Sequence, residues 1–181
     1  HAVKITLYRI GNKSRLIKAL IHAAKKGKQV FIFIEAKARF DESSNMYWGQ
    51  RLKKAGAQVV YSFPEIKVHA KILQIQWQDG NYISYIGTGN FNEKNAAIYT
   101  DFALLSADLT LGKDIAEVFA LLEGKRVLPK HSKIKIAPFE LRSFLEKHIQ
   151  AEQEKAQLGQ RAIIKAKLNN LEDESIIALL I

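Results

Sequence analysis

His69 and Lys71, separated by a single residue, have the side chains best suited to chemistry in this 181-residue sequence. They alternate with the apolar residues Val68, Ala70 and Ile72, a pattern typical of a strand with two unlike faces. An imidazole can attack a phosphoryl group, and a nearby ammonium can neutralise the oxygens of that group. The spacing therefore predicts His69 as a nucleophile and Lys71 as its cationic partner on one face of a strand.

A second motif follows the next predicted strand and contains Gly87, Gly89 and Asn90. Glycines let backbone N–H groups approach an anion closely, so these three residues are predicted to bind phosphate. A lone histidine on a strand is usually a surface or hydrogen-bonded residue, and a lone Gly-x-Gly is usually a turn. The two motifs on successive strands favour a common site.

Arg9 and Arg39 each come at or just past the end of a predicted parallel strand. Ligands of open α/β sheets collect at that edge. A guanidinium has no lone pair to give a metal, but its forked donors suit phosphate oxygens. We therefore expect both arginines to bind phosphate, although surface ion pairs are the alternative interpretation.

Alternation of strand and helix patterns predicts the elements that position these residues. Strands are predicted at residues 3–9, 29–35, 57–63 and 101–107, and one on each side of the turn at 79–81. Helices are predicted at about 14–24, 43–55 and 109–122. The first three strands, separated by helices, indicate a parallel arrangement with right-handed crossovers. The turn at 79–81 indicates an antiparallel hairpin, so the sheet is predicted to be mixed.

Composition limits the function classes. The chain has no cysteine, which excludes disulfides and zinc–thiolate sites. Its net charge of +10, from 28 Lys and Arg against 18 Asp and Glu, indicates a phosphate-rich partner: nucleic acid, anionic membrane or polyphosphate. With neither a spanning apolar run nor a signal peptide, we expect a cytoplasmic protein, free or peripheral at the inner membrane.

Three regions are predicted along the chain. Residues 1–123 form the catalytic domain, 124–160 a linker and a bridging helix, and 161–181 the start of a second, similar domain. The last region repeats the strand, Asn-containing turn and helix of residues 3–21. The apolar end of the sequence indicates a piece of a longer polypeptide. We expect the rest of that polypeptide to be a partner, and the isolated piece to be inactive.

The His-x-Lys and Gly-Thr-Gly-Asn motifs together resemble the phospholipase D superfamily signature. Five segments in order resemble the bacterial polyphosphate kinase family of the first type: residues 6–9, 35–41, 67–71, 87–92 and 105–108. The resemblance covers nearly the whole chain. It implies an α/β fold, a phospholipase D-like mixed sheet flanked by helices, plus the start of a second similar domain.

The resemblance also implies an activity, the reversible transfer of the ATP γ-phosphate to polyphosphate through a phosphohistidine at His69. ATP, ADP and inorganic polyphosphate would be the ligands and Mg²⁺ the cofactor. The magnesium-phosphate site of the family maps onto Arg9 and Arg39, where we expect the metal to be bound through phosphate. Tyr99 maps onto a nucleotide-contacting tyrosine, with a core aromatic as the alternative. We expect the full-length protein to be a homo-oligomer and to bind no nucleic acid.

Two departures and two alternative functions accompany this resemblance. Gln76 stands where the phospholipase D pattern has an aspartate, and Tyr85 stands where the kinase family often has a second histidine.

Glu35 and Asp41 are candidate carboxylates for orienting His69 or Arg39. A phospholipase D-type phosphodiesterase or nuclease half, and a non-catalytic basic module that binds nucleic acid, remain as alternatives.

Overall fold

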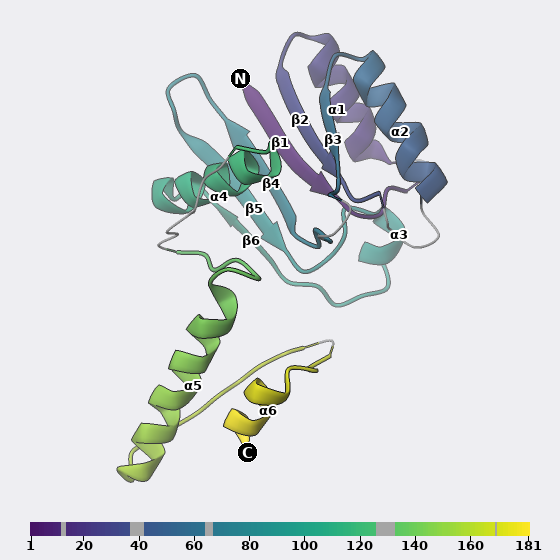
Figure 1. The fold of residues 1–181 in the computed structure, drawn as a ribbon. Helices are drawn as coiled ribbons and strands as arrows, with labels where there is room; N and C mark the ends of the chain where they lie inside the picture. The colour runs from purple at the N-terminus through teal and green to yellow at the C-terminus, as the bar shows by residue number, and fades with distance from the viewer. Residues whose placement is uncertain (12–13, 37–41, 64–66, 126–132, 169) are drawn as a thin grey trace. The chain divides into compact units, whose positions relative to one another are not determined.

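The computed structural model describes residues 1–11, 14–36, 42–63, 67–125, 133–168 and 170–181 (Figure 1). The chain divides into two compact units, His1–Lys133 and Ile134–Ile181. All six strands lie in the first unit. Among the residues described, no helix is both long enough and apolar enough to cross a membrane.

The first unit is built on one six-stranded sheet, in the order β3-β2-β1-β4-β5-β6. The strands are β1 (Ala2–Leu7), β2 (Gln29–Ile34), β3 (Gln58–Tyr61), β4 (Lys71–Gln76), β5 (Tyr82–Gly87) and β6 (Ala103–Ser106). Strands β1, β2 and β3 pair in parallel, and β4, β5 and β6 pair antiparallel. The predicted mixed sheet and its hairpin are confirmed, with the hairpin strand β4 beside β1 in the middle of the sheet.

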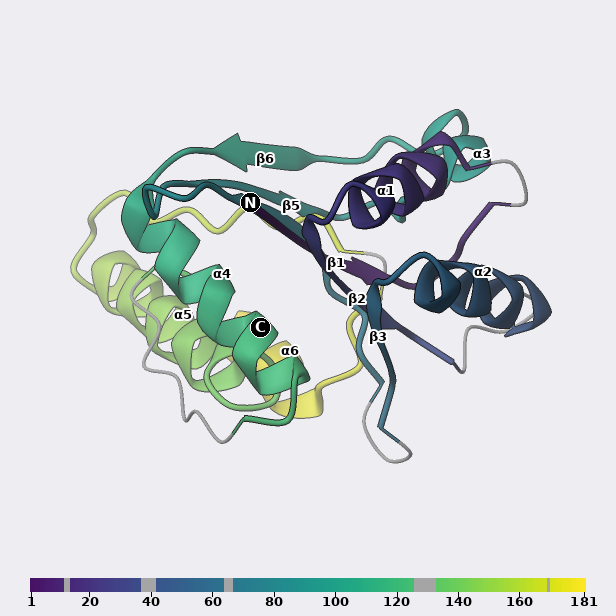
Figure 2. The same cartoon turned by 90° about the horizontal axis from the view of Figure 1, so that it is seen from above.

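The helices of this unit are α1 (Arg15–Lys25), α2 (Glu42–Lys54), α3 (Glu93–Ala96) and α4 (Leu109–Leu122). Helices α1 and α2 connect the parallel strands, and Figure 2 shows them on one face of the sheet with α4 on the other. Ser14 is the N-cap of α1, because its side chain accepts a hydrogen bond from the Ile17 N–H. Gly27, just after the helix, has a positive φ of 75°.

Strand β2 is covered on both faces, as its continuous apolar run predicts. Ile32 and Ile34 belong to the core between the sheet and helices α1 and α2. Phe31 points to the opposite face, where its ring lies 6.1 Å from that of Phe119 in α4. Burial on both sides makes β2 a rigid support for the chain that leaves it at Glu35.

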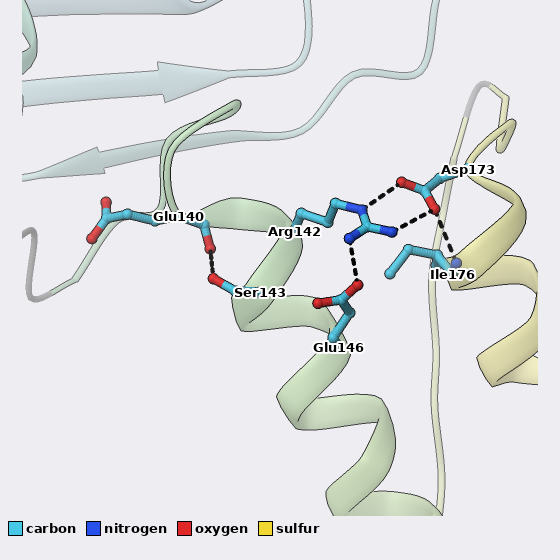
Figure 3. A network of polar contacts seen from close by, with 6 residues as sticks. All are labelled: Glu140, Arg142, Ser143, Glu146, Asp173 and Ile176. Atoms are coloured by element: carbon cyan, nitrogen blue, oxygen red, sulfur yellow. Dashed lines mark hydrogen bonds and ion pairs between the residues drawn. The ribbon is translucent and has the colours of Figure 1, made fainter.

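The second unit contains two helices, α5 (Leu141–Gln157) and α6 (Glu174–Leu180). Figure 3 shows how Arg142 of α5 joins them: its guanidinium donates to both oxygens of Asp173, and it pairs with Glu146 one turn further on. Asp173 is also the N-cap of α6, because it accepts a hydrogen bond from the Ile176 N–H. The guanidinium of Arg142 lowers the pKa of the Asp173 carboxyl.

The strand predicted at residues 161–168 is not present in the described part of this unit. The Ile163 N–H donates to the Glu152 carboxylate of α5 instead of to a neighbouring strand. An alternating apolar pattern becomes a strand only where a second strand supplies the ladder hydrogen bonds. The prediction that a second similar domain begins near residue 161 is not tested by this observation.

Candidate active site

The antiparallel strands bring both chemical motifs to the edge where the parallel strands end. Strand β1 ends at Leu7, β4 begins at Lys71, and β5 ends at Gly87, which pairs directly with Lys71. The segment before β4 and the loop after β5 therefore lie beside the residues that follow β1. This is the edge at which α/β sheets bind ligands.

His69 lies just outside the sheet. Strand β4 begins at Lys71, and residues 67–70 have no regular secondary structure, so the prediction of a shared strand face is wrong. The reason is the Thr6 side chain, which donates to the Ala70 carbonyl at 2.6 Å and accepts from the Ile72 N–H at 3.1 Å. These bonds hold the chain where β1 ends. His69 consequently stands exposed at the edge of the sheet.

Lys71 is buried, with 6% of its surface exposed. Its Nζ donates to the His69 carbonyl oxygen at 2.6 Å. Burial lowers the pKa of Lys71 to about 8, with a further lowering by Lys67 and an opposing effect of Asp101. The ammonium therefore lies beside the histidine, as predicted, and it gives up its proton more readily than an exposed lysine.

The environment of His69 favours the neutral imidazole. Partial desolvation lowers the pKa of His69, and the positive charges of Lys71, Lys67 and Arg9 lower it further. Glu35 acts in the opposite direction. An unperturbed histidine has a pKa near 6.5, and the pKa of His69 is lower than this. At neutral pH the ring is therefore uncharged and one of its nitrogens keeps a free lone pair.

Tyr8 is the residue of this site that the sequence analysis did not single out. It directly follows β1 and is buried, with 8% of its surface exposed. Its ring centroid lies 4.8 Å from that of His69, at an interplanar angle of 88°. The same ring is 5.3 Å from Lys67 Nζ, 5.4 Å from Lys71 Nζ and 6.0 Å from Arg9 Cζ. In the sequence, Tyr8 stands next to Arg9 within the first of the five segments that carry the family resemblance.

Glu35 holds the main chain next to His69. This carboxylate is 1% exposed and follows β2. Its Oε2 accepts from the Val68 N–H at 2.9 Å, and its Oε1 accepts from the Ser62 hydroxyl at 2.7 Å. The Glu35 carboxylate thus binds the backbone of Val68, the residue before His69, and not the imidazole itself.

The loop after β5 is tightly packed at both predicted phosphate-binding glycines. A Cβ on Gly87 would collide with the Tyr85 ring, and one on Gly89 would collide with the Asp101 carboxylate. Thr88 Oγ1 donates to Asp101 Oδ1 at 2.9 Å, which fixes this carboxylate against the loop. Only glycine permits so close an approach.

Asn90, in the same loop, has a buried Oδ1 without a hydrogen-bond partner in the described part of the chain. Burial of an unpaired amide oxygen is costly, and such atoms in a site commonly receive a ligand. Helix α3 follows, and the Glu93 carboxylate accepts from the Arg15 N–H of α1 at 2.9 Å. This bond holds the loop beside the segment that follows β1.

The other residues named in the sequence analysis have different outcomes. Arg39 and Asp41 lie outside the described residues. Tyr99 is 64% exposed, so the alternative interpretation of a core aromatic is wrong. Tyr85 packs its ring against Gly87 and 5.2 Å from the ring of Phe91. Gln76 donates to the Tyr82 hydroxyl within the hairpin.

The described residues do not form a protein cage for Mg²⁺. Within them, no three His, Asp or Glu side chains converge in a way that could hold a metal ion. Arg9 cannot supply a ligand, because a guanidinium has no free lone pair.

Comparison with known proteins agrees with this geometry. Residues 1–127 match the family model for polyphosphate kinase C-terminal domain 1, and residues 134–181 match the model for polyphosphate kinase C-terminal domain 2. Polyphosphate kinases of Salmonella typhimurium and Parasynechococcus marenigrum are 40% and 43% identical to the chain, over 97% and 98% of it. The chain spans only 26% and 25% of the lengths of these curated relatives.

Solved structures give the same result. The crystal structure of polyphosphate kinase from Porphyromonas gingivalis matches 99% of the chain and 30% of its own length, with a TM-score of 0.88 and 34% identity. NucT from Helicobacter pylori matches 68% of the chain and 79% of its own length, with a TM-score of 0.54 and 14% identity, a likeness of fold alone. The predicted phospholipase D-like fold is confirmed. The chain belongs to the polyphosphate kinase family and corresponds to part of its C-terminal region.

Proposed function

We propose that in the full-length protein this chain carries the nucleophile of a polyphosphate kinase, and that the nucleophile is His69. The observation that carries the proposal is an exposed imidazole at the sheet edge, whose pKa is lowered by partial desolvation and by three surrounding cations. A neutral imidazole can attack phosphorus, and the cations that lower its pKa are the groups that attract a polyanionic substrate.

In the first step, a lone pair of the His69 imidazole forms a bond to the γ-phosphorus of ATP. The bond between that phosphorus and the bridging oxygen breaks, and ADP leaves with the electron pair. Negative charge on the transferring oxygens is stabilised by fixed cations, which need no reorganisation during the reaction. In the second step, a terminal oxygen of polyphosphate attacks the same phosphorus, and the imidazole regains its lone pair. Both steps are reversible.

The other predicted residues have distinct roles in this proposal. Lys71 neutralises the transferring group, and Arg9 and Arg39 bind phosphate oxygens with forked donors. The carboxamide of Asn90 can turn to offer either its N–H or its oxygen, and its unpaired atom is consistent with a ligand contact. The Gly87 and Gly89 amides complete the phosphate contacts, and Tyr99, exposed on the segment between α3 and β6, contacts the nucleotide.

In this proposal magnesium would arrive with the nucleotide, and Arg9 and Arg39 would hold it through the phosphate oxygens that they contact. This assignment follows from the donor sets: Mg²⁺ takes oxygen ligands and commonly binds substrate phosphates together with a few carboxylates or waters. No step of the transfer proposed for His69 depends on a protein ligand to the metal.

The test is to incubate the full-length protein with γ-labelled ATP and to look for acid-labile, base-stable label. We expect label on His69 in the wild type and none in His69→Ala. A matched control is His22→Ala, because His22 is exposed on α1 and its loss should leave labelling unchanged.

Label that persists in His69→Ala would contradict the proposal, as would complete absence of label in the wild type. A phosphodiesterase half would form its histidine adduct from a phosphodiester and would take no γ-phosphate. A nucleic-acid-binding module would form no adduct. The experiment therefore also separates these two alternatives from the kinase.

A further inference from the structure

The ring of Tyr8 connects the groups that the proposed reaction needs. It lies against the His69 ring in an edge-to-face arrangement, the favoured geometry of an aromatic pair. It also lies within 6.0 Å of the cationic groups of Lys67, Lys71 and Arg9. In the described part of the chain, no other aromatic ring lies this close to three cationic groups.

Tyr8 is itself held firmly. Its main chain is fixed by Asn45 of α2, whose Nδ2 donates to the Tyr8 carbonyl at 2.9 Å. Its side chain is buried, and the preceding residue, Leu7, ends β1 in register with Ile34 of β2. An aromatic side chain has few rotatable bonds, so a buried one forms a rigid support.

His69, by contrast, has little else to fix it. It is exposed and lies in a segment without regular structure, which is tied down at Val68 by Glu35 and at Ala70 by Thr6. Those two bonds fix the backbone on either side. They leave the rotation of the imidazole to its packing partner, and the recorded ring contact is with Tyr8.

A tyrosine ring suits this place for a second reason. Three cations close together repel one another, and a π face attracts each of them without adding a full negative charge. A carboxylate in the same place would attract them more strongly, but it would repel an incoming phosphate and raise the pKa of the imidazole. The ring therefore adds no full negative charge beside the imidazole.

We propose that Tyr8 is a positioning residue for the phosphorylation of His69, in which its ring fixes the orientation of the imidazole beside the cations that stabilise the transferring phosphoryl group. This inference rests on the proposed function of His69. It assigns to Tyr8 an effect on the rate of transfer and not on the binding of ATP.

The test compares Tyr8→Phe with Tyr8→Leu in the full-length protein. Single-turnover labelling of His69 is measured at several ATP concentrations, at a temperature at which circular dichroism shows each variant folded. A misplacement of about 1 Å can slow a reaction about 100-fold, so for loss of the packing partner we expect labelling at saturating ATP to slow about tenfold in Tyr8→Leu. The ATP concentration that gives half-maximal labelling should stay within about twofold.

Tyr8→Phe keeps the ring and should restore the rate to near the wild-type value, which a role in overall stability alone would not require. The matched control is Tyr47→Leu, because Tyr47 also has a cation over its ring, Arg51 at 5.5 Å, but is 52% exposed on α2. Its labelling rate should not change.

Equal labelling rates in Tyr8→Leu and the wild type would overturn the positioning role while leaving His69 as the nucleophile. So would an equal loss in Tyr8→Phe and Tyr8→Leu, which would assign the effect to the hydroxyl. Absence of label from wild-type His69 would overturn the proposed function and the positioning role together. A slow Tyr8→Leu and a rapid Tyr8→Phe would support the inference.

Discussion

The phosphoryl transfer proposed above requires His69 and Lys71 to hold opposite protonation states at the same pH. The imidazole needs its lone pair, and the ammonium needs its proton. Burial and the positive charge of Lys67 lower both pKa values, although Asp101 opposes this effect on Lys71. The lower pKa keeps the histidine neutral and makes the lysine easier to deprotonate. The chemistry of the site is therefore confined to a window between two titrations.

The position of this window can be predicted. The pKa of His69 is below its usual 6.5, so activity should be lost only as the pH falls below that value and the imidazole is protonated. The pKa of Lys71 is about 8, so activity should fall as the pH rises through about 8 and the ammonium is lost. We expect a bell-shaped pH profile of kcat/KM for ATP, which reports the free enzyme.

Lys71→Arg isolates the alkaline limb of this profile. A guanidinium keeps its proton to about pH 12, so the variant should show no fall near pH 8, whatever its absolute rate. At pH 9 the wild type should retain about one-tenth of its maximal kcat/KM, because about one-tenth of its Lys71 side chains are still protonated. An unchanged alkaline limb in Lys71→Arg would assign that limb to another group.

At the scale of residues, the sequence predicted the charged and nucleophilic side chains of the site but not the aromatic ring that packs against them. His69, Lys71 and Arg9 were chosen by residue type and position, and the structure brings their charges together. Tyr8 was missed, because a tyrosine after a strand is in most proteins a core or surface residue. Its role depends on contacts with residues about sixty positions away, which no local pattern reports.

At the scale of elements, helix α2 joins the ends of two strands. Asn45, 1% exposed, donates from Nδ2 to the carbonyls of Tyr8 and Glu35, and its Oδ1 accepts from the Ile10 N–H at 3.2 Å. One carboxamide thus pairs three backbone groups of the chain that leaves β1 and β2. These two segments carry the ring beside His69 and the carboxylate that holds Val68.

Asn45→Ala should therefore lower both stability and activity. Three buried backbone groups would lose their partner, for which we expect a fall of about 3 kcal/mol in the free energy of unfolding, measured by urea denaturation. Labelling of His69 should slow as well, because the ends of both strands loosen. The control is Gln50→Ala on the exposed face of the same helix, where little change is expected. Equal stabilities of the two variants would contradict the role given to Asn45.

The order and type of the elements were predictable from local patterns, whereas their ends were not. The helix predicted at 109–122 is confirmed at both ends. Its start is fixed by Asp108, which caps the first turn. The strand predicted at 57–63 is shorter, Gln58–Tyr61, and residues 67–70 and 161–168 are not strands. Alternation indicates that a segment can form a strand; where pairing begins depends on the neighbouring chain.

On the scale of the whole molecule, the chain holds only part of a polyphosphate kinase. The two compact units, His1–Lys133 and Ile134–Ile181, correspond closely to the two family models, at 1–127 and 134–181. The net charge of +10 suits a phosphate-rich partner but does not identify it. The proposed mechanism requires both substrates to meet the same histidine, and this requirement can be tested only in the full-length protein.

The most direct measurement is a chase of labelled His69 in that protein. The full-length protein is labelled with γ-labelled ATP, freed of nucleotide and mixed rapidly with unlabelled polyphosphate or with ADP. Label should leave His69 at least as fast as the steady-state turnover measured for that acceptor, and should appear in polyphosphate or in ATP respectively. Label that stays on His69 while polyphosphate grows at its normal rate would contradict the account.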